Sequence, residues 1–208
     1  PDDEQFYEDI YISTKTENKS WTVPENIGRA FNSDNHDASV GISFDGQQLI
    51  TFKNGDLYIS YLNGQKWTTP EALQKEINTS EIESSACFSP DGNRLYFVRG
   101  KNFDTSKSNG DIYFCTKISE NKWSEATALP STINTENDED AVFMNPDGKT
   151  LYFSSKGHNS MGGFDIFKTE LLENGNWTEP QNLGFPINSP SDDIYFVTSG
   201  SGKTCYYS

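Results

Sequence analysis

The sequence EDAVFMNPDGKTLYFS, at residues 139–154, consists of two short apolar and aromatic runs joined by a Pro-Asp-Gly turn. Residues 83–98 repeat this arrangement as ESSACFSPDGNRLYFV, with the same turn at Asp91-Gly92. Two such runs around a tight Asp-Gly turn are typical of a β-hairpin, because glycine supplies the positive φ that the turn requires. Both stretches are therefore predicted to fold as hairpins.

Three marks recur in fixed register and show that the hairpin belongs to a larger repeat. Each tryptophan is followed ten residues later by an apolar-Asn-Ser/Thr triplet and twenty-five residues later by a glycine. The tryptophans are Trp21, Trp67, Trp123 and Trp177; the triplets begin at Phe31, Ile77, Ile133 and Ile187; the glycines are Gly46, Gly92, Gly148 and Gly202. Such a register indicates a repeat architecture. The tryptophans are expected to pack between neighbouring units.

Each unit also contains an Asp-Ile/Leu-Tyr/Phe motif that predicts a third strand, and the next tryptophan marks a fourth. These motifs begin at Asp9, Asp56, Asp111 and Asp165. With the hairpin they make a four-stranded meander of about 46 to 56 residues, the size of a propeller blade. The sequence therefore predicts an all-β fold, a β-propeller of four-stranded antiparallel blades. A single domain covers residues 1–208, with repeat units near 21–66, 67–122, 123–176, and 177–208 plus 1–20.

The first and last segments are predicted to be complementary halves of one blade. The chain opens with the third-strand motif at Asp9 and ends on a second strand at Ser208. One arrangement is a closed four-bladed ring in which residues 9–13 pair with residues 205–208, which leaves no strand edge unpaired. The other is an arc of a larger propeller. The sequence leaves both open.

Charge limits the classes of partner. Sixteen basic and thirty-one acidic residues give a formal net charge of -15. Nucleic-acid binding is not expected, because it needs basic residues that displace phosphate counterions. No apolar run approaches the roughly 18 to 20 residues of a spanning helix, so no direct membrane insertion is expected. The acidity is explained first by solubility, and the alternatives are a basic protein partner or a cation site. The three cysteines, Cys87, Cys115 and Cys205, are predicted to be small buried residues.

A binding surface is predicted on the face where the loops before each first strand emerge. Four equivalent carboxylates, Asp37, Glu83, Glu139 and Asp193, are expected to ring the mouth of the central channel, with Asn102, His158 and Asn159 on adjoining loops. Such a ring could hold Ca²⁺, which favours several oxygen ligands, or the cationic group of a partner. The alternative is that each carboxylate accepts backbone N–H groups within its own loop.

The sequence shows no catalytic constellation. It has only two histidines and no Gly-x-Ser-x-Gly nucleophile motif. Many carboxylates are present, but the sequence singles out no pair suited to glycoside hydrolysis. The protein is therefore not expected to be an enzyme, and no cofactor is required.

Two of the hairpins resemble a known family. The stretches Ser89–Phe97 and Asn145–Phe153 resemble the Pro-Asp-Gly β-propeller repeat, a relative of WD repeats that also occurs in the TolB propeller. Residues 154–167, SSKGHNSMGGFDIF, are similar to repeats in Bacteroidetes envelope proteins that join this propeller to an OmpA-like domain. The resemblance implies a noncatalytic interaction or scaffold module, periplasmic and outer-membrane associated. A glycan-binding or glycan-cleaving propeller is the alternative.

Overall fold

The computed structural model describes residues 8–34, 36–100, 109–120, 122–199 and 203–208, and all regular elements within them are β-strands. The strands form five antiparallel sheets. The predicted all-β fold is therefore confirmed. No helix in this part of the chain is long and apolar enough to cross a membrane.

Three sheets are complete blades. Blade A contains β3 (Asp37–Ile42), β4 (Gln48–Lys53), β5 (Asp56–Asn63), β6 (Lys66–Trp67) and β7 (Glu71–Ala72). Blade B contains β8 (Ile82–Phe88), β9 (Arg94–Gly100), β10 (Asp111–Ser119), β11 (Lys122–Trp123) and β12 (Thr127–Ala128). Blade C contains β13 (Glu139–Met144), β14 (Thr150–Ser155), β15 (Asp165–Glu170) and β16 (Gln181–Asn182). In blades A and B the predicted fourth strand is two short pieces, which pair with the two ends of the third strand.

The remaining two sheets have two strands each, and we call them together the split blade because the repeat register predicts that they are halves of one unit. The outer half is β1 (Tyr11–Ile12) paired with β2 (Glu25–Asn26), and the inner half is β17 (Phe196–Thr198) paired with β18 (Cys205–Tyr207). Among the described strands, β1 and β18 have no further partner. The predicted pairing of residues 9–13 with residues 205–208 is therefore wrong for this structure: within the described part of the chain, β1 pairs only with β2, and β18 pairs only with β17.

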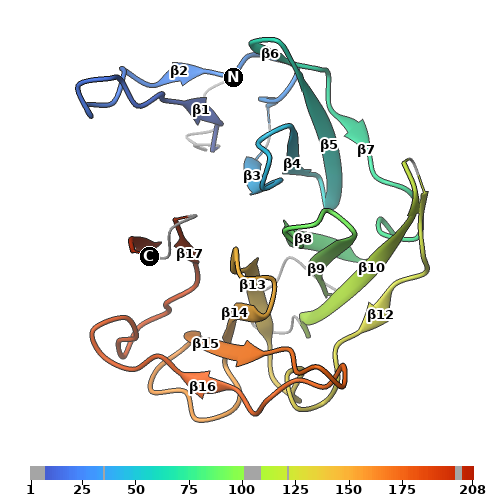
Figure 1. Cartoon of the computed structure of the whole chain (residues 1–208), viewed down its shortest axis with the longest axis vertical. Helices are drawn as coiled ribbons and strands as arrows, with labels where there is room; N and C mark the ends of the chain where they lie inside the picture. Colours follow the sequence, from blue (N-terminus) through green and yellow to red (C-terminus); the bar gives the residue numbers. More distant parts are fainter. Residues whose placement is uncertain (1–7, 35, 101–108, 121, 200–202) are drawn as a thin grey trace.

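The sheets surround a central space. Figure 1 shows β3, β8, β13 and β17 nearest to this space, with β7, β12 and β16 towards the outside. Successive innermost strands lie side by side, β3 on β8, β8 on β13 and β13 on β17. This arrangement is the propeller architecture that the repeat predicts.

The predicted Asp-Gly turns connect the first and second strands. Gly46, Gly92 and Gly148 have φ values of 70°, 67° and 69°, in the left-handed region that glycine adopts without steric cost. In blade B the hydroxyl of Ser89 donates to the Asp91 carboxylate at 2.5 Å, and that carboxylate accepts the Asn93 backbone N–H at 3.0 Å. The predicted turn at Gly202 lies outside the described residues.

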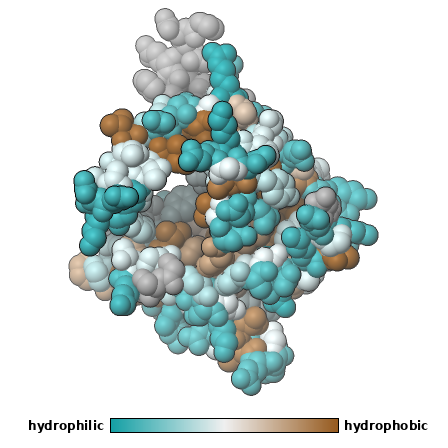
Figure 2. All heavy atoms as spheres, turned by 45° about the horizontal axis from the view of Figure 1, so that its top comes forward, coloured by the Kyte–Doolittle hydropathy of each residue, from teal (hydrophilic) through white to brown (hydrophobic). Residues whose placement is uncertain are grey.

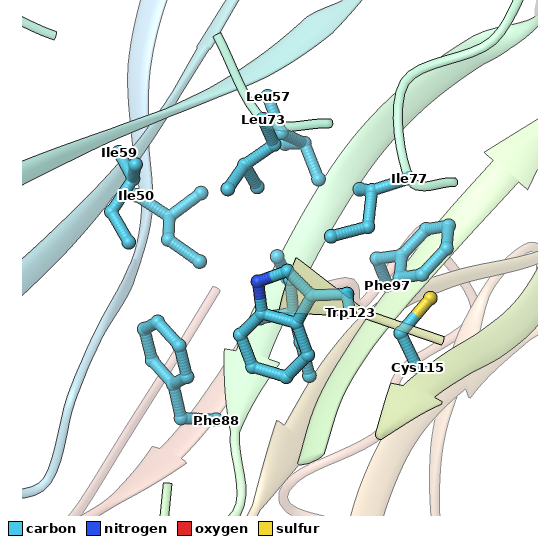
Figure 3. Packing of buried hydrophobic residues seen from close by; sticks show 11 residues of the cluster. Ile50, Leu57, Ile59, Leu73, Ile77, Phe88, Phe97, Cys115 and Trp123 are labelled. Atoms are coloured by element: carbon cyan, nitrogen blue, oxygen red, sulfur yellow. The ribbon is translucent and has the colours of Figure 1, made fainter. Parts of the chain in front are cut away.

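The hydrophobic core lies between the blades rather than within one sheet. Between blades A and B, aliphatic side chains pack against an aromatic surface that includes Trp123 (Figure 3). Trp177 packs in the equivalent position between blades B and C, and Trp67 packs against Leu49 and the outer half of the split blade. Three of the four tryptophans therefore pack between units, as their spacing predicts.

The split blade leaves repeat positions uncovered that are buried elsewhere. Trp21 is 60% exposed, whereas Trp123 is 6% exposed. Tyr206 on β18 is 59% exposed, whereas its equivalent Tyr96 is 1% exposed. The expected packing role is therefore wrong for Trp21. The expected burial is confirmed for Cys87 and Cys115 and wrong for Cys205, which is exposed on β18.

Candidate functional site

The four equivalent carboxylates are buried at the starts of the innermost strands. Asp37, Glu83, Glu139 and Asp193 are only 2%, 0%, 1% and 9% exposed. Each accepts the backbone N–H of the Ser or Thr that ends the apolar-Asn-Ser/Thr triplet four residues earlier, at 2.5 to 3.1 Å. In three of the four, the hydroxyl of that residue donates to the same carboxylate. The geometry is that of the loop-acceptor alternative, and it presents no accessible carboxylate ring to a partner.

The asparagine of each triplet also has a structural role. The side chain of Asn78 accepts the backbone N–H of Leu57 and donates to the carbonyl of the same residue, both at 2.9 Å. Asn32, Asn134 and Asn188 make the same pair of bonds to Ile10, Ile112 and Ile166. The side-chain amide therefore makes the hydrogen bonds to the backbone N–H and carbonyl at the start of each third strand that a neighbouring strand would otherwise make.

Two of the buried carboxylates differ in how their charge is balanced. Glu83 accepts the Nε–H of Arg99 at 2.8 Å, and the guanidinium of Arg99 also donates to the carbonyl of Ile77 at 2.9 Å. Glu139 instead accepts the hydroxyl of Ser155 at 2.7 Å and has no ion pair among the described residues. Burial therefore raises the pKa of Glu139 to about 7.

The predicted loop residues are not brought together with an open carboxylate ring. The Nε2 atom of His158 lies 3.1 Å from the carbonyl oxygen of Ile133, and its ring packs against Phe153 and Phe167. Asn159 is exposed, and its carbonyl accepts from the side chain of Asn182 at 3.3 Å. Asn102 lies outside the described residues. His158 thus contributes to loop packing through one side of its ring, and both His158 and Asn159 are exposed to solvent.

The described part of the chain contains no cluster of side chains that could bind a metal ion. No three side chains of the Asp, Glu, His and Cys types lie close enough together there to hold an ion. A Ca²⁺ ion held by the ring would require the four carboxylates to converge. Each is instead bonded into its own loop.

The central channel is a cavity of about 630 Å³ lined by the innermost strands. None of the residues that line it is Asp, Glu, Lys, Arg or His. Its titratable groups are Cys87, Tyr152 and Tyr195; burial raises the pKa of Cys87 to about 12 and raises the pKa of both tyrosines. The lining is therefore uncharged at neutral pH.

Apolar side chains of the channel are open to solvent. Ile42 and Val197 are 55% and 40% exposed, and Phe44 and Tyr195 are exposed with them. Figure 2 shows the molecule hollowed near its centre, with apolar residues along part of the edge of the hollow. Sequence reasoning missed this surface because it followed polar residues. The available signal was the uncharged, largely apolar run within each innermost strand, as in Val40 to Ile42 and Ala141 to Met144.

Comparison with solved structures supports the fold. TolB from Acinetobacter baumannii superposes with a TM-score of 0.57 at 16% identity, over 95% of this chain and 42% of TolB. XC5397 from Xanthomonas campestris, described as a gluconolactonase, superposes with a TM-score of 0.53 at 15% identity, over 84% of this chain and 55% of that protein. The chain thus spans about half the length of these structures. At such identities the likeness shows a TolB-like propeller fold alone.

No protein-family model matches the chain, and no curated protein matches it.

Proposed function

We propose that this chain is a noncatalytic interaction module of the bacterial cell envelope, which binds a segment of a protein partner in its central channel. The observation that carries the proposal is the uncharged channel of about 630 Å³, with exposed apolar side chains on its wall. Concave, mostly apolar cavities are the usual binding sites of proteins, and exposed apolar surface of this kind marks an interaction site.

The same lining favours binding over catalysis. Hydrolysis of a glycoside needs two carboxyl groups that face the substrate, one as acid and one as base or nucleophile. The four carboxylates at the strand starts are buried in loop hydrogen bonds. The thiol of Cys87 keeps its proton because burial raises its pKa to about 12, so it is a poor nucleophile. We therefore propose no enzymatic role, and the glycan-cleaving alternative is the weaker hypothesis.

The partner is proposed to combine an apolar anchor with basic flanks. The anchor fits the uncharged channel, where a charged side chain would lose its hydration without gaining a counter-charge. Basic residues are proposed on both sides of this anchor because the net charge of this chain is -15. That charge attracts Lys and Arg side chains of the partner and speeds association at low salt. Acidity thus acts on the rate of association, while the channel supplies the specific contact.

The envelope assignment rests on two supports. Residues 154–167 are similar to repeats of envelope proteins with an OmpA-like domain, and the fold is TolB-like. We propose that the chain is part of a larger outer-membrane-associated protein that acts in the periplasm. Fractionation of cells that produce the full gene product tests this. Recovery of the protein with cytoplasmic markers would contradict it.

Channel substitutions test the binding proposal. Ile42→Lys and Val197→Lys place a charge in the channel at positions that are already exposed. Ile118→Lys, at the exposed C-terminal end of β10, is the matched control. Displayed-peptide selection on the wild type is expected to yield peptides with an apolar residue between basic ones. Both channel variants should bind those peptides at least tenfold more weakly than the control does. Equal binding by all variants, or turnover of a glycan by the wild type, would contradict the proposal.

A further inference from the structure

A second cavity, of about 530 Å³, lies between blades B and C. We call it the seam pocket; Arg94, Tyr96, Phe114, Pro130, Asn176 and Trp177 contribute to its walls. The ring of Tyr96 meets Trp177 edge-on at 6.3 Å between centroids and meets Phe114 at 5.9 Å. Aromatic rings from two blades therefore form its walls. It shares no lining residue with the central channel.

The repeat shows that this pocket is not a requirement of the fold. At the seam of blades A and B, Gln74 accepts the backbone N–H of Trp123 at 3.2 Å, and the indole of Trp123 is buried. Pro130 follows its tryptophan by the same seven residues as Gln74 does. A proline ring cannot extend to make this contact, and Trp177 is only partly buried, whereas Trp123 is 6% exposed. The space that Gln74 occupies in one seam is therefore open in the next.

The walls differ between the two seams as well. Tyr96 pairs with Phe114 across β9 and β10, and the equivalent pair in blade A is Ile50 with Ile59. Arg94 has Gln48 as its equivalent. At these positions the first seam combines Trp123 with aliphatic and amide side chains, whereas the second combines Trp177 with two further rings and one guanidinium. Residues that only maintain the fold would recur in both seams.

Arg94 is the only charged residue that lines the seam pocket. Its guanidinium lies 5.3 Å from the centroid of the Phe114 ring and donates weakly to the Tyr96 hydroxyl at 3.4 Å. It has no ion pair among the described residues, although the chain contains 31 acidic residues. A guanidinium that is fixed by these contacts and has no ion pair can bind a carboxylate through two parallel N–H hydrogen bonds.

We propose that the seam pocket binds a sugar that carries a carboxylate, of the uronic-acid type. The carboxylate pairs with Arg94. The apolar C–H face of the sugar ring packs on the partly exposed rings of Phe114 and Trp177, which Tyr96 supports from its buried position. The hydroxyl of Thr132 and the amide of Asn176, both on the pocket wall, can exchange hydrogen bonds with the sugar hydroxyls. A cavity of this size falls in the usual range for small-molecule sites.

Two ligands that differ by one group test the proposal. Methyl glucuronide and methyl glucoside share the same ring, and only the glucuronide carries a carboxylate. Each is titrated into the intact protein while the NMR signal of the Trp177 indole is followed. The glucuronide should shift that signal with at least tenfold higher affinity than the glucoside does. Equal affinity for the two ligands, or no shift with either, overturns the proposal.

Two variants assign the binding to this pocket. Arg94→Gln should abolish the preference for the glucuronide, because the ion pair is lost. Pro130→Gln introduces the residue type that fills the seam of blades A and B, and it should weaken binding of the glucuronide at least fivefold. Arg29→Gln removes an exposed arginine elsewhere and should change nothing. Circular dichroism and the melting temperature verify the fold of each variant. Folded Arg94→Gln and Pro130→Gln proteins that both keep wild-type affinity would overturn the assignment.

Discussion

Glu139→Gln should make the protein less sensitive to alkaline pH. Glu139 is buried, and burial raises its pKa from 4.5 to about 7. The folded state therefore holds the proton more tightly than the unfolded chain does. The stability that this proton contributes is complete below about pH 4.5 and is lost as the pH rises through about 7.

The expected size follows from the shift. A difference of about 2.5 pKa units at 1.36 kcal/mol per unit sets an upper limit of about 3.4 kcal/mol. The pKa of about 7 already includes the hydrogen bonds from Thr135 and Ser155, which stabilise the charged form. Relaxation around the charged carboxylate reduces the effect to about 1 to 3 kcal/mol. Glutamine stays neutral at all pH values. The free energy of unfolding of the variant, relative to wild type, should therefore rise by that amount between pH 4.5 and pH 8.

Urea unfolding of both proteins at four pH values from 4.5 to 8 measures this difference. Glu83→Gln is the matched control, because Glu83 occupies the equivalent position and is paired with Arg99 at 2.8 Å. The control should be destabilised at every pH, since it loses the ion pair. Parallel pH profiles for wild type and Glu139→Gln would show that this carboxyl does not titrate near neutral pH and would refute the reasoning.

Three further predictions concern stability and are checked by urea unfolding. Arg99→Met leaves the buried Glu83 carboxylate without its cation and should cost about 3 to 5 kcal/mol; a cost below about 1 kcal/mol would contradict the importance of the pair. Trp123→Ala should cost about 3 to 5 kcal/mol, whereas the exposed Trp21→Ala should cost less than about 1 kcal/mol. An equal loss of stability in the Trp21→Ala and Trp123→Ala variants would contradict this prediction, because it would mean that Trp21 is buried in solution. Gly41→Ala places a methyl group 2.5 Å from a carbonyl oxygen of β8 and should cost about 1 to 3 kcal/mol; an unchanged midpoint would contradict this close approach.

The strands and turns were predictable because their signals are local and occur several times. Each Asp-Gly turn lies between two runs of strand composition, and a hairpin needs little else. One Asp-Gly turn alone is a weak indication of a hairpin. The same spacing from tryptophan to glycine, as from Trp123 to Gly148, occurs in every repeat unit and makes the prediction much stronger. The broken fourth strand was missed because its two short pieces pair with separate segments of β5 and β10, and no local sequence pattern marks that break.

The orientation of the carboxylates was harder to predict. Whether Glu83 points to solvent or into its loop depends on which N–H groups the loop presents. The signal was present four residues earlier, where Thr79 donates through both its backbone and its hydroxyl. The exposure of Trp21 and Cys205 carries no such local signal. It depends on the sheet that packs against them, and identical repeat marks give different burial where that neighbour is incomplete.

A repeat protein offers an internal control for every residue, and this helps to separate structure from function. A contact that recurs in each blade, such as the amide of Asn78 or Asn134 on a strand backbone, is explained by the blade itself. A feature that one blade has and its neighbours lack needs another explanation. Arg94 and Pro130 satisfy that criterion at the seam of blades B and C. The central channel does not, since every innermost strand contributes to it, so its claim to function rests on its uncharged, exposed wall and is best tested by substitutions there.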